Sequence, residues 1–181
     1  MDTHQLRKVL EQDKLTKKIL KGVFASDQLN FTQKKYPFLL IVNSDPASLP
    51  GTHWLALYLS SKQEGEFYDS YGNDISSYSK TIDKFMKRHT HRVICNDIQI
   101  QSYDSNVCGQ HCLFYLIHRV RQVGMESIVK FFSSDKEWND IMVDDFIYKH
   151  FNFADRALSS SQGECLVKQL SRPYFPCKTF V

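Results

Sequence analysis

The residues with the clearest chemical potential lie in segment 101–116, which reads QSYDSNVCGQHCLFYL. Turn-forming residues precede Cys108, and an apolar run with helical spacing follows it. Ser105 or Asn106 is a suitable N-cap, which predicts that Cys108 lies in the first turn of a helix. Unpaired backbone N–H groups and the positive end of the helix dipole favour a thiolate there. Cys108 is therefore a candidate nucleophile, and Gly109 would let a substrate backbone approach its sulfur.

Two other roles for this cysteine have to be weighed. Cysteine is often a small, buried and inert side chain, so Cys108 could simply pack where a helix meets the core. The same segment also holds His111, Cys112 and His118, but three residues separate the two cysteines and no second pair balances them. This spacing differs from that of a zinc knuckle, so we expect no metal site. Cys112 is better explained as facing inward, one turn after Cys108.

A thiolate nucleophile requires an imidazole to take its proton, a carboxylate to orient that imidazole, and donors for the developing oxyanion. The chain offers His53, Asp69 and Gln101 for these roles, in the order His, Asp, Gln, Cys. Each alone could be ordinary: a surface histidine, a turn aspartate or a glutamine on an edge strand. Their joint order favours a catalytic set, in which the Gln101 amide joins the backbone N–H of Cys108 in an oxyanion hole.

Short apolar runs bounded by turn residues predict the strands that would carry these side chains. We expect strands at 38–43, 55–59, 66–71 and 92–101. A short polar turn joins the second to the third, which predicts a hairpin. His53 opens this hairpin and Asp69 lies near its close, so antiparallel pairing would bring the two to the same end of the sheet.

Helical spacing of apolar residues predicts the remaining elements. We expect short amphipathic helices over 3–20 closed by Gly22, a helix over 76–89, a buried central helix over 106–123 stopped by Gly124, and helices over 125–132 and 137–151, the last begun by a Ser134–Glu137 capping box. From 157 the composition predicts an extended tail. The fold class is α+β, with a mostly antiparallel central sheet packed against the buried helix that carries the nucleophile.

Composition narrows the class of protein. The 181 residues are 42% hydrophobic, enough for one sizeable core, and no linker divides them, so we expect a single domain over 1–181. A formal net charge of +3 permits an acidic or nucleic-acid partner but does not argue for one. Five cysteines without a regular framework indicate a reducing compartment. Without a signal-like or membrane-spanning run, we expect a soluble, intracellular monomer.

Together these segments resemble the adenain family of adenovirus-type cysteine proteases, found in adenoviruses and in Polinton or Maverick virus-like elements. SUMO-processing proteases share the fold of this family. The resemblance covers about residues 22–120 and rests on Ile41-Val42-Asn43, His53-Trp54, Phe67-Tyr68-Asp69-Ser70-Tyr71-Gly72, and Gln101 followed by Asn106-Val107-Cys108-Gly109.

The resemblance implies a papain-like or adenain-type fold and a role for each matching residue. Cys108 would be the nucleophile, His53 the base and Asp69 the acid that orients it. Gln101 would be the oxyanion donor, and Trp54 would pack against the site. Adenovirus enzymes commonly carry Glu where Asp69 stands, whereas Asp is usual in the SUMO-type relatives.

The family also implies a substrate: viral capsid or core precursor proteins, cleaved at Gly-containing sites during virion maturation, in the host nucleus or the virion. Loop 44–52, which contains Gly51, and the tail beyond Gln162 would form the walls of the cleft. The alternatives are a protease of SUMO or ubiquitin-like modifiers with the same fold, and a non-catalytic binding module.

No cofactor is required by the sequence. Adenovirus enzymes are, however, activated by a short peptide joined through a disulfide and by DNA. Cys95 falls near the position of the linking cysteine of the family, although an ordinary strand cysteine is the preferred interpretation. The lysine clusters at 14–18 and 34–35 are short and typical of solvated surfaces, so they give DNA activation little support.

Overall fold

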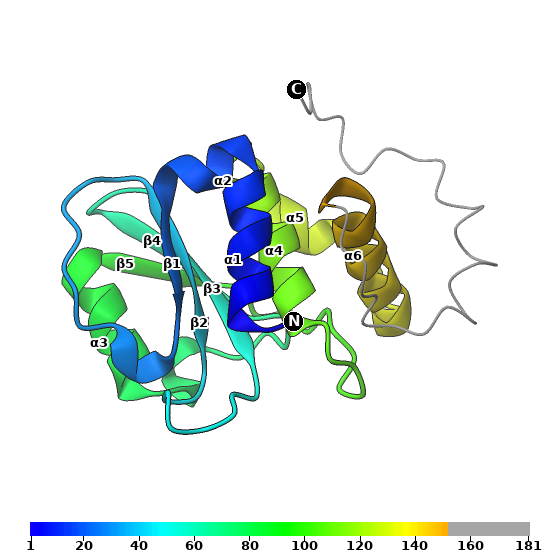
Figure 1. Ribbon diagram of the computed structural model, residues 1–181, viewed down its shortest axis with the longest axis horizontal. Helices are drawn as coiled ribbons and strands as arrows, with labels where there is room; N and C mark the ends of the chain where they lie inside the picture. The colour runs from blue at the N-terminus through cyan, green and yellow to red at the C-terminus, as the bar shows by residue number, and fades with distance from the viewer. Residues whose placement is uncertain (152–181) are drawn as a thin grey trace.

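The computed structural model describes residues 1–151, and these form one five-stranded sheet with helices on both faces (Figure 1). The strands lie in chain order across the sheet: β1 (Leu20–Phe24), β2 (Phe38–Asn43), β3 (Trp54–Leu59), β4 (Glu64–Tyr68) and β5 (Arg92–Cys95). The helices are α1 (Thr3–Gln12), α2 (Lys14–Ile19), α3 (Lys80–His89), α4 (Cys108–Arg119), α5 (Met125–Phe131) and α6 (Lys136–Phe151), with 3-10 turns η1 (Ser26–Gln28) and η2 (Ile75–Ser77). The predicted tail from 157 lies outside the described residues.

The sheet is mixed, so the expectation of a mostly antiparallel sheet is wrong. The central pairings β2–β3 and β3–β4 are antiparallel, and the latter confirms the predicted hairpin. The outer pairings β1–β2 and β4–β5 are parallel. Each outer strand is joined to its neighbour by a long connection, residues 25–37 on one side and the segment with α3 on the other. Such a connection returns the chain to the end from which it started, which parallel pairing requires.

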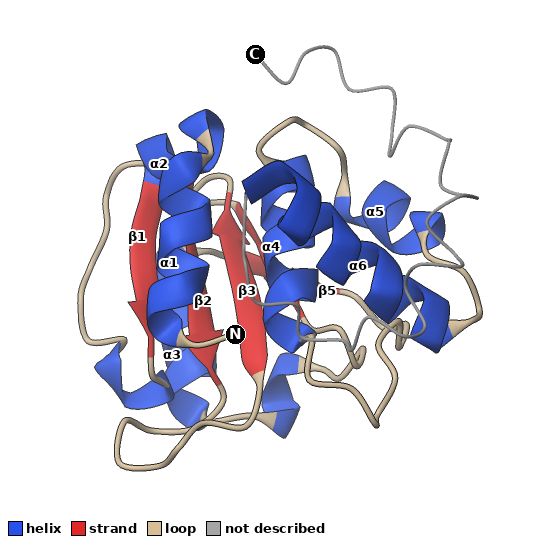
Figure 2. Cartoon of the chain, turned by 45° about the vertical axis from the view of Figure 1, so that its right-hand side comes forward, coloured by secondary structure: helices blue, strands red, loops and turns tan. Residues whose placement is uncertain are grey.

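Alternate residues of β2 enter two separate cores, as the period of a strand dictates. Leu39 and Ile41 belong to the core beneath α1, α4, α5 and α6. Phe38, Leu40 and Val42 belong to the core on the α3 face. Figure 2 shows this division, with α1, α4 and α6 in front of the sheet and α3 behind it. The whole of β2 is therefore buried, which explains why its run FLLIVN has no polar alternation.

Helix α4 is the centre of the larger core. Every residue from Cys108 to His118 is buried, because β3 lies along one side of the helix and α1, α5 and α6 pack on the others. The predicted buried central helix is confirmed, but its boundaries are shorter than 106–123. It begins at Cys108, and the chain leaves it through Gln122, whose φ of 67° is left-handed. Gly124 precedes α5 as its N-cap and does not end α4.

Gly22 does not end a helix, contrary to expectation. It lies within β1, which the sequence analysis missed, at a φ of 148°. The strand contributes Val23 to the larger core and depends on parallel pairing with β2. A five-residue strand at the sheet edge carries little periodic signal of its own, so this element is set by its partner.

Two further boundaries differ because side chains bond the backbone. The strand predicted over 92–101 ends at Cys95, since the Asn96 side chain binds the backbone of Asp69 instead of continuing the ladder. Helix α6 starts one residue earlier than expected. Its capping hydrogen bond runs from the Trp138 N–H to Asp135 Oδ1 at 3.0 Å, so Asp135 replaces the predicted Ser134 capping box.

Gly72, in the turn after β4, allows a test of this architecture. Its φ is 71°, and an added Cβ would lie 2.6 Å from the carbonyl carbon of Ile98 and 2.8 Å from the backbone nitrogen of Gln99. Gly72→Ala should therefore lower the free energy of unfolding by about 2 kcal/mol or more, because neither backbone can yield cheaply. Gly124→Ala is the matched control, since no atom lies within 4 Å of its added Cβ. Urea unfolding would measure both, and equal losses would contradict the close approach.

Candidate active site

The ends of β3 and β4 bring His53 and Asp69 into contact. The antiparallel register pairs Ala56 with Tyr68, so the residue just before β3 and the residue just after β4 lie at one end of the sheet. His53 Nε2 lies 2.6 Å from Asp69 Oδ1, and both side chains are buried. The predicted meeting of these two residues is confirmed. A 2.6 Å contact between an imidazole and a buried carboxylate fixes which ring nitrogen faces the acid.

Asp69 is surrounded by hydrogen-bond donors. Oδ1 also accepts the backbone N–H of Tyr71 at 3.0 Å, and Oδ2 accepts the backbone N–H and the side-chain amide of Asn73, each at 3.0 Å. The Tyr78 hydroxyl donates to Oδ2 at 2.6 Å. Burial alone raises the pKa of this carboxyl, but the bonds from His53, Tyr78 and Tyr71 outweigh burial and lower it. Asp69 is therefore an anion at neutral pH.

His53 is held between aromatic rings as well as by Asp69. Its ring stacks on Tyr71 with centroids 4.7 Å apart, and Tyr78 lies at 6.2 Å with nearly parallel planes. Burial lowers the pKa of the imidazole, but Asp69 and Cys108 raise it further, to about 9. His53 Nδ1 is buried and makes no hydrogen bond within residues 1–151. A pKa of about 9 makes the ring a cation at neutral pH, and the Cys108 side chain contributes to that rise.

Cys108, the first residue of α4, is a free and mostly buried thiol. Burial raises its pKa, but the His53 imidazole outweighs burial and the net shift is downward. The N-cap of α4 is Val107, not the predicted Ser105 or Asn106, and its side chain makes no capping bond. The first N–H groups of the helix are thus left uncapped beside the sulfur, where they favour a thiolate. The start of α4 favours a thiolate at Cys108, as the sequence predicted, although the N-cap residue differs from the predicted one.

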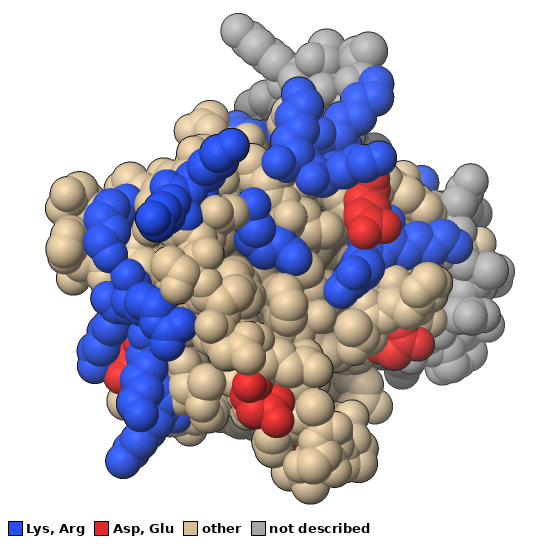
Figure 3. Space-filling model, turned by 60° about the vertical axis from the view of Figure 1, so that its left-hand side comes forward, with Lys and Arg blue, Asp and Glu red and all other residues tan. Residues whose placement is uncertain are grey.

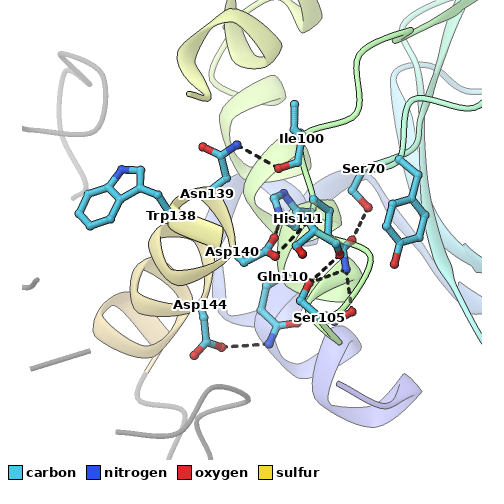
Figure 4. Close-up of polar contacts among 12 residues, drawn as sticks. Ser70, Ile100, Ser105, Gln110, His111, Trp138, Asn139, Asp140 and Asp144 are labelled. Carbon is cyan, nitrogen blue, oxygen red and sulfur yellow. Dashed lines mark hydrogen bonds and ion pairs between the residues drawn. The ribbon is translucent and has the colours of Figure 1, made fainter. Parts of the chain in front are cut away.

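Gln101 is fully buried, and both ends of its amide are bonded. Its Oε1 accepts the Ser70 hydroxyl at 2.6 Å. Its Nε2 donates to the Ser105 carbonyl at 3.2 Å and to the Ser105 hydroxyl at 3.1 Å (Figure 4). Because a carbonyl can only accept, the atom facing Ser105 must be the nitrogen. The amide donor is therefore directed into the loop that leads to Cys108, and it bonds Ser105 in this conformation.

The space beside Gly109 is filled, contrary to the expectation that this glycine lets a substrate backbone approach the Cys108 sulfur. A Cβ there would lie 3.0 Å from Leu6 Cδ2 and 3.4 Å from Trp54 Cδ1. Gly109 thus lets α1 and Trp54 pack on the start of α4, so a substrate backbone would have no room at this point. Trp54, half-buried at the start of β3, lies against the helix of Cys108 as expected.

A groove of about 510 Å³ opens next to Trp54. Gly51, at a φ of 85°, lies in its wall, and loop 44–52 contributes much of the lining. The remaining lining comes from residues 1–3, from Val23 to Gln28 at the end of β1 and in η1, and from Asn43 at the end of β2. The tail beyond Gln162, the other expected wall, lies outside the described residues.

The other described cysteines, Cys112 and Cys95, have raised pKa values, whereas that of Cys108 is lowered. Cys112, one turn later on α4, is fully buried, and its Sγ donates to the Trp54 carbonyl at 3.2 Å. Burial raises its pKa well above the ordinary value. Cys95 is half-buried opposite Phe67 in the sheet and packs against the core on the α3 face. Burial raises its pKa too, which is the behaviour of an ordinary strand cysteine.

Neither a metal cluster nor a spanning helix is found in the described part of the chain. Residues 1–151 hold no group of three or more His, Cys, Asp or Glu placed to bind a metal ion, and His111 bonds Asp140 instead. No helix within these residues is long and apolar enough to cross a membrane.

Several residues that build this site were not predicted from the sequence. Tyr71, Asn73 and Tyr78 follow Asp69 within nine positions, so their proximity was a usable signal. Ser70 lies in the segment that carries the resemblance but was given no role, and Asn96 was not recognisable. Asn96 bonds both the N–H and the carbonyl of Asp69, at 2.9 and 2.6 Å, from 27 positions away. Only the parallel pairing of β5 with β4 brings it there.

The charges of this site predict the pH dependence of thiol alkylation. Cys108 should react with iodoacetamide along a curve whose midpoint lies below that of an ordinary thiol, because its lowered pKa yields thiolate at lower pH. His53→Ala should move the midpoint upward, since the largest of the influences that oppose burial is then lost. Mass spectrometry of the labelled peptides would follow Cys95, whose pKa is raised, as the internal control. Equal midpoints for Cys108 and Cys95 would contradict the pairing with His53.

Comparisons with known proteins give no family assignment. No family model matches the chain, and no curated protein matches it. Among solved structures it is similar to the ASFV pS273R protease, with a TM-score of 0.45 and 21% identity over 61% of this chain. The chain spans 44% of the length of that protease. It is also similar to the central domain of the uncharacterized Lpg1148 protein from Legionella pneumophila, with a TM-score of 0.47 and 12% identity, covering 82% of this chain and 97% of that domain.

Proposed function

We propose that this protein is a cysteine endopeptidase with Cys108 as nucleophile, His53 as general base and Asp69 as the orienting acid. One observation carries the proposal: a buried imidazole contacts a buried carboxylate at 2.6 Å and lowers the pKa of a thiol at a helix N-terminus. An inert core cysteine needs no such partners. Cys112, on the same helix, has no such imidazole, and burial raises its pKa. This contrast also argues against a non-catalytic binding module.

The proposed reaction uses each group once in each half-cycle. In the free protein the proton already resides on the His53 imidazolium, and the Cys108 thiolate attacks the peptide carbonyl. Negative charge then develops on the carbonyl oxygen, near the uncapped N–H groups at the start of α4 and the Gln101 amide. The imidazolium gives its proton to the leaving amine, and a thioester remains. Water, deprotonated by the now neutral His53, attacks the thioester, releases the acid and restores the thiolate and the imidazolium.

Gln101 would have to exchange its partner during this cycle. Its Nε2 bonds Ser105 in the free protein and would turn toward the oxyanion when substrate binds. The Ser70 hydroxyl would keep hold of the other end of the amide, which makes the exchange a small rotation instead of a rearrangement.

The finer assignment rests on the resemblance to adenain. We propose viral or virus-like structural precursors as substrates, cut at Gly-containing sites during virion maturation in the host nucleus or the virion. The groove beside Trp54 and Gly51 would receive one side of the scissile sequence. The alternative substrate is a SUMO or ubiquitin-like modifier, which would need the same site behind a different surface.

The activators of adenovirus enzymes are a further part of this proposal. Figure 3 shows a face on which lysine and arginine side chains outnumber the acidic ones. Exposed lysines at 14, 17, 18 and 21 follow one another along α2 and β1. Such a surface could attract DNA at low salt, whereas a peptide disulfide at Cys95 would require that half-buried thiol to open.

Cys108→Ala should abolish cleavage of peptides with glycine near the scissile bond while the chain stays folded, because the nucleophile is lost and little volume changes. Cys95→Ala, the same substitution on β5, should leave cleavage unchanged. Chromatography of the peptide products measures both. Cleavage that persists in Cys108→Ala would refute the assignment. Labelling of Cys108 by a ubiquitin or SUMO carboxy-terminal electrophile, without peptide cleavage, would favour the modifier protease.

A further inference from the structure

Helix α6 holds the backbone on both sides of Gln101, and Figure 4 shows one of the two contacts, between Asn139 and Ile100. The Asn139 amide donates to the Ile100 carbonyl at 3.0 Å, and Asp140 Oδ2 accepts the Ser102 N–H at 3.1 Å. Both α6 side chains are almost completely buried. Two adjacent residues of one helix thus fix the two peptide groups that flank the proposed oxyanion donor.

The same carboxylate also reaches the first turn of α4. Asp140 Oδ1 lies 2.8 Å from Nε2 of His111, which is fully buried. Burial lowers the pKa of His111, so the ring is neutral and carries its proton on the nitrogen that faces Asp140. His111 is three residues from Cys108. Asp140 therefore ties together the chain after Gln101 and the helix turn that carries the nucleophile.

The remaining contacts of Gln101 complete this frame. The N–H groups of Ile100 and Gln101 both donate to the Ser70 carbonyl, at 2.9 and 3.1 Å. The Ser70 hydroxyl bonds the Gln101 side chain. The segment is thus held by the chain after β4 on one side and by α6 on the other. If either support is lost, Gln101 is free to move relative to Cys108.

We infer that Asn139 and Asp140 are positioning residues for the oxyanion hole, acting through Gln101. The inference rests on the proposed function and extends it to a helix that carries no catalytic residue. Oxyanion donors act only when they are held within a fraction of an ångström of the developing charge. A buried carboxylate that merely joined two helices would need only the His111 contact. The Ser102 contact is the one that reaches the Gln101 segment.

Asp144 provides a matched control on the same helix. It is also buried, and its Oδ1 accepts the Gln110 side-chain amide from α4 at 3.0 Å. Figure 4 shows this bond about one turn along α6 from Asp140. Asp144 therefore links the same two helices, through a bond to α4 and not to the Gln101 segment. Asp140→Asn and Asp144→Asn make the same chemical change at two inter-helix contacts, of which one touches the Gln101 segment.

The test compares two reactions of Cys108 in the full chain. Acylation by p-nitrophenyl acetate passes through an oxyanion: the thiolate displaces p-nitrophenolate and becomes an acetyl thioester. Alkylation by iodoacetamide displaces iodide at a saturated carbon and forms no oxyanion. A defect in the oxyanion hole should slow the first reaction only, whereas a defect in the thiolate or the fold should slow both.

Gln101→Ala should slow acylation about 100-fold, and Asp140→Asn at least about tenfold, with alkylation unchanged. Asp144→Asn should leave both rates within about twofold of the parent, because its bond does not support the donor. Added to Gln101→Ala, Asp140→Asn should cost little more, since the residue it positions is already gone. If the Asp140→Asn variant does not fold, Asn139→Asp is tested in its place. This substitution replaces the amide donor with a carboxylate that faces the Ile100 carbonyl.

Three results would overturn the inference while leaving the proposed function intact. These are equal effects of Asp140→Asn and Asp144→Asn, parallel loss of acylation and alkylation, and a full additional loss from Asp140→Asn in the Gln101→Ala background. By contrast, a parent protein whose Cys108 alkylates no faster than Cys95 and is not acylated would refute the proposed function itself, and the inference with it.

Discussion

The Asp69 carboxylate, held ionised inside the protein beside His53, is the constraint on which the rest of the site depends. A buried anion is tolerated only when hydrogen bonds and an opposite charge replace its lost water. Asp69 has both: four donors from the Tyr71–Tyr78 segment and the imidazole of His53. The Tyr71 and Asn73 donors come from the sharp turn after β4, where Gly72 occupies a point at which no side chain fits.

The backbone of Asp69 organises the next part of the chain. Asn96 bonds the N–H and the carbonyl of Asp69, which ends β5 and directs the chain across the end of the sheet. Ser70 then receives Ile100 and Gln101 on its carbonyl. The acid and the proposed oxyanion donor are thus neighbours in space through two consecutive residues, although 32 positions separate them in the sequence. The same contacts stabilise the fold and set the geometry of the site.

Helix α4 shows how the surroundings, more than the residue type, decide the chemistry of a cysteine. Cys108 and Cys112 lie one turn apart, and both are buried. Burial raises the pKa of Cys112, whose sulfur donates to the Trp54 carbonyl. At Cys108 the imidazole reverses the effect of burial, and the helix terminus adds uncapped N–H groups. A thiol with a lowered pKa and one with a raised pKa therefore follow from a single turn of helix and one neighbouring histidine.

The sequence by itself determined the strands 38–43 and 55–59 to within a residue, the β3–β4 hairpin, and hence the meeting of His53 with Asp69. It also placed Cys108 at a helix start, because local periodicity and turn residues specify such elements. Only the tertiary structure decided the parallel outer strands, the filled space beside Gly109, and the bonds from Asn96, Asn139 and Asp140. The bonds from Asn96, Asn139 and Asp140 join segments about 27 to 39 positions apart, and no local sequence pattern specifies them. They depend on which strands pair and on how α6 packs against α4, so they arise only when the whole chain has folded.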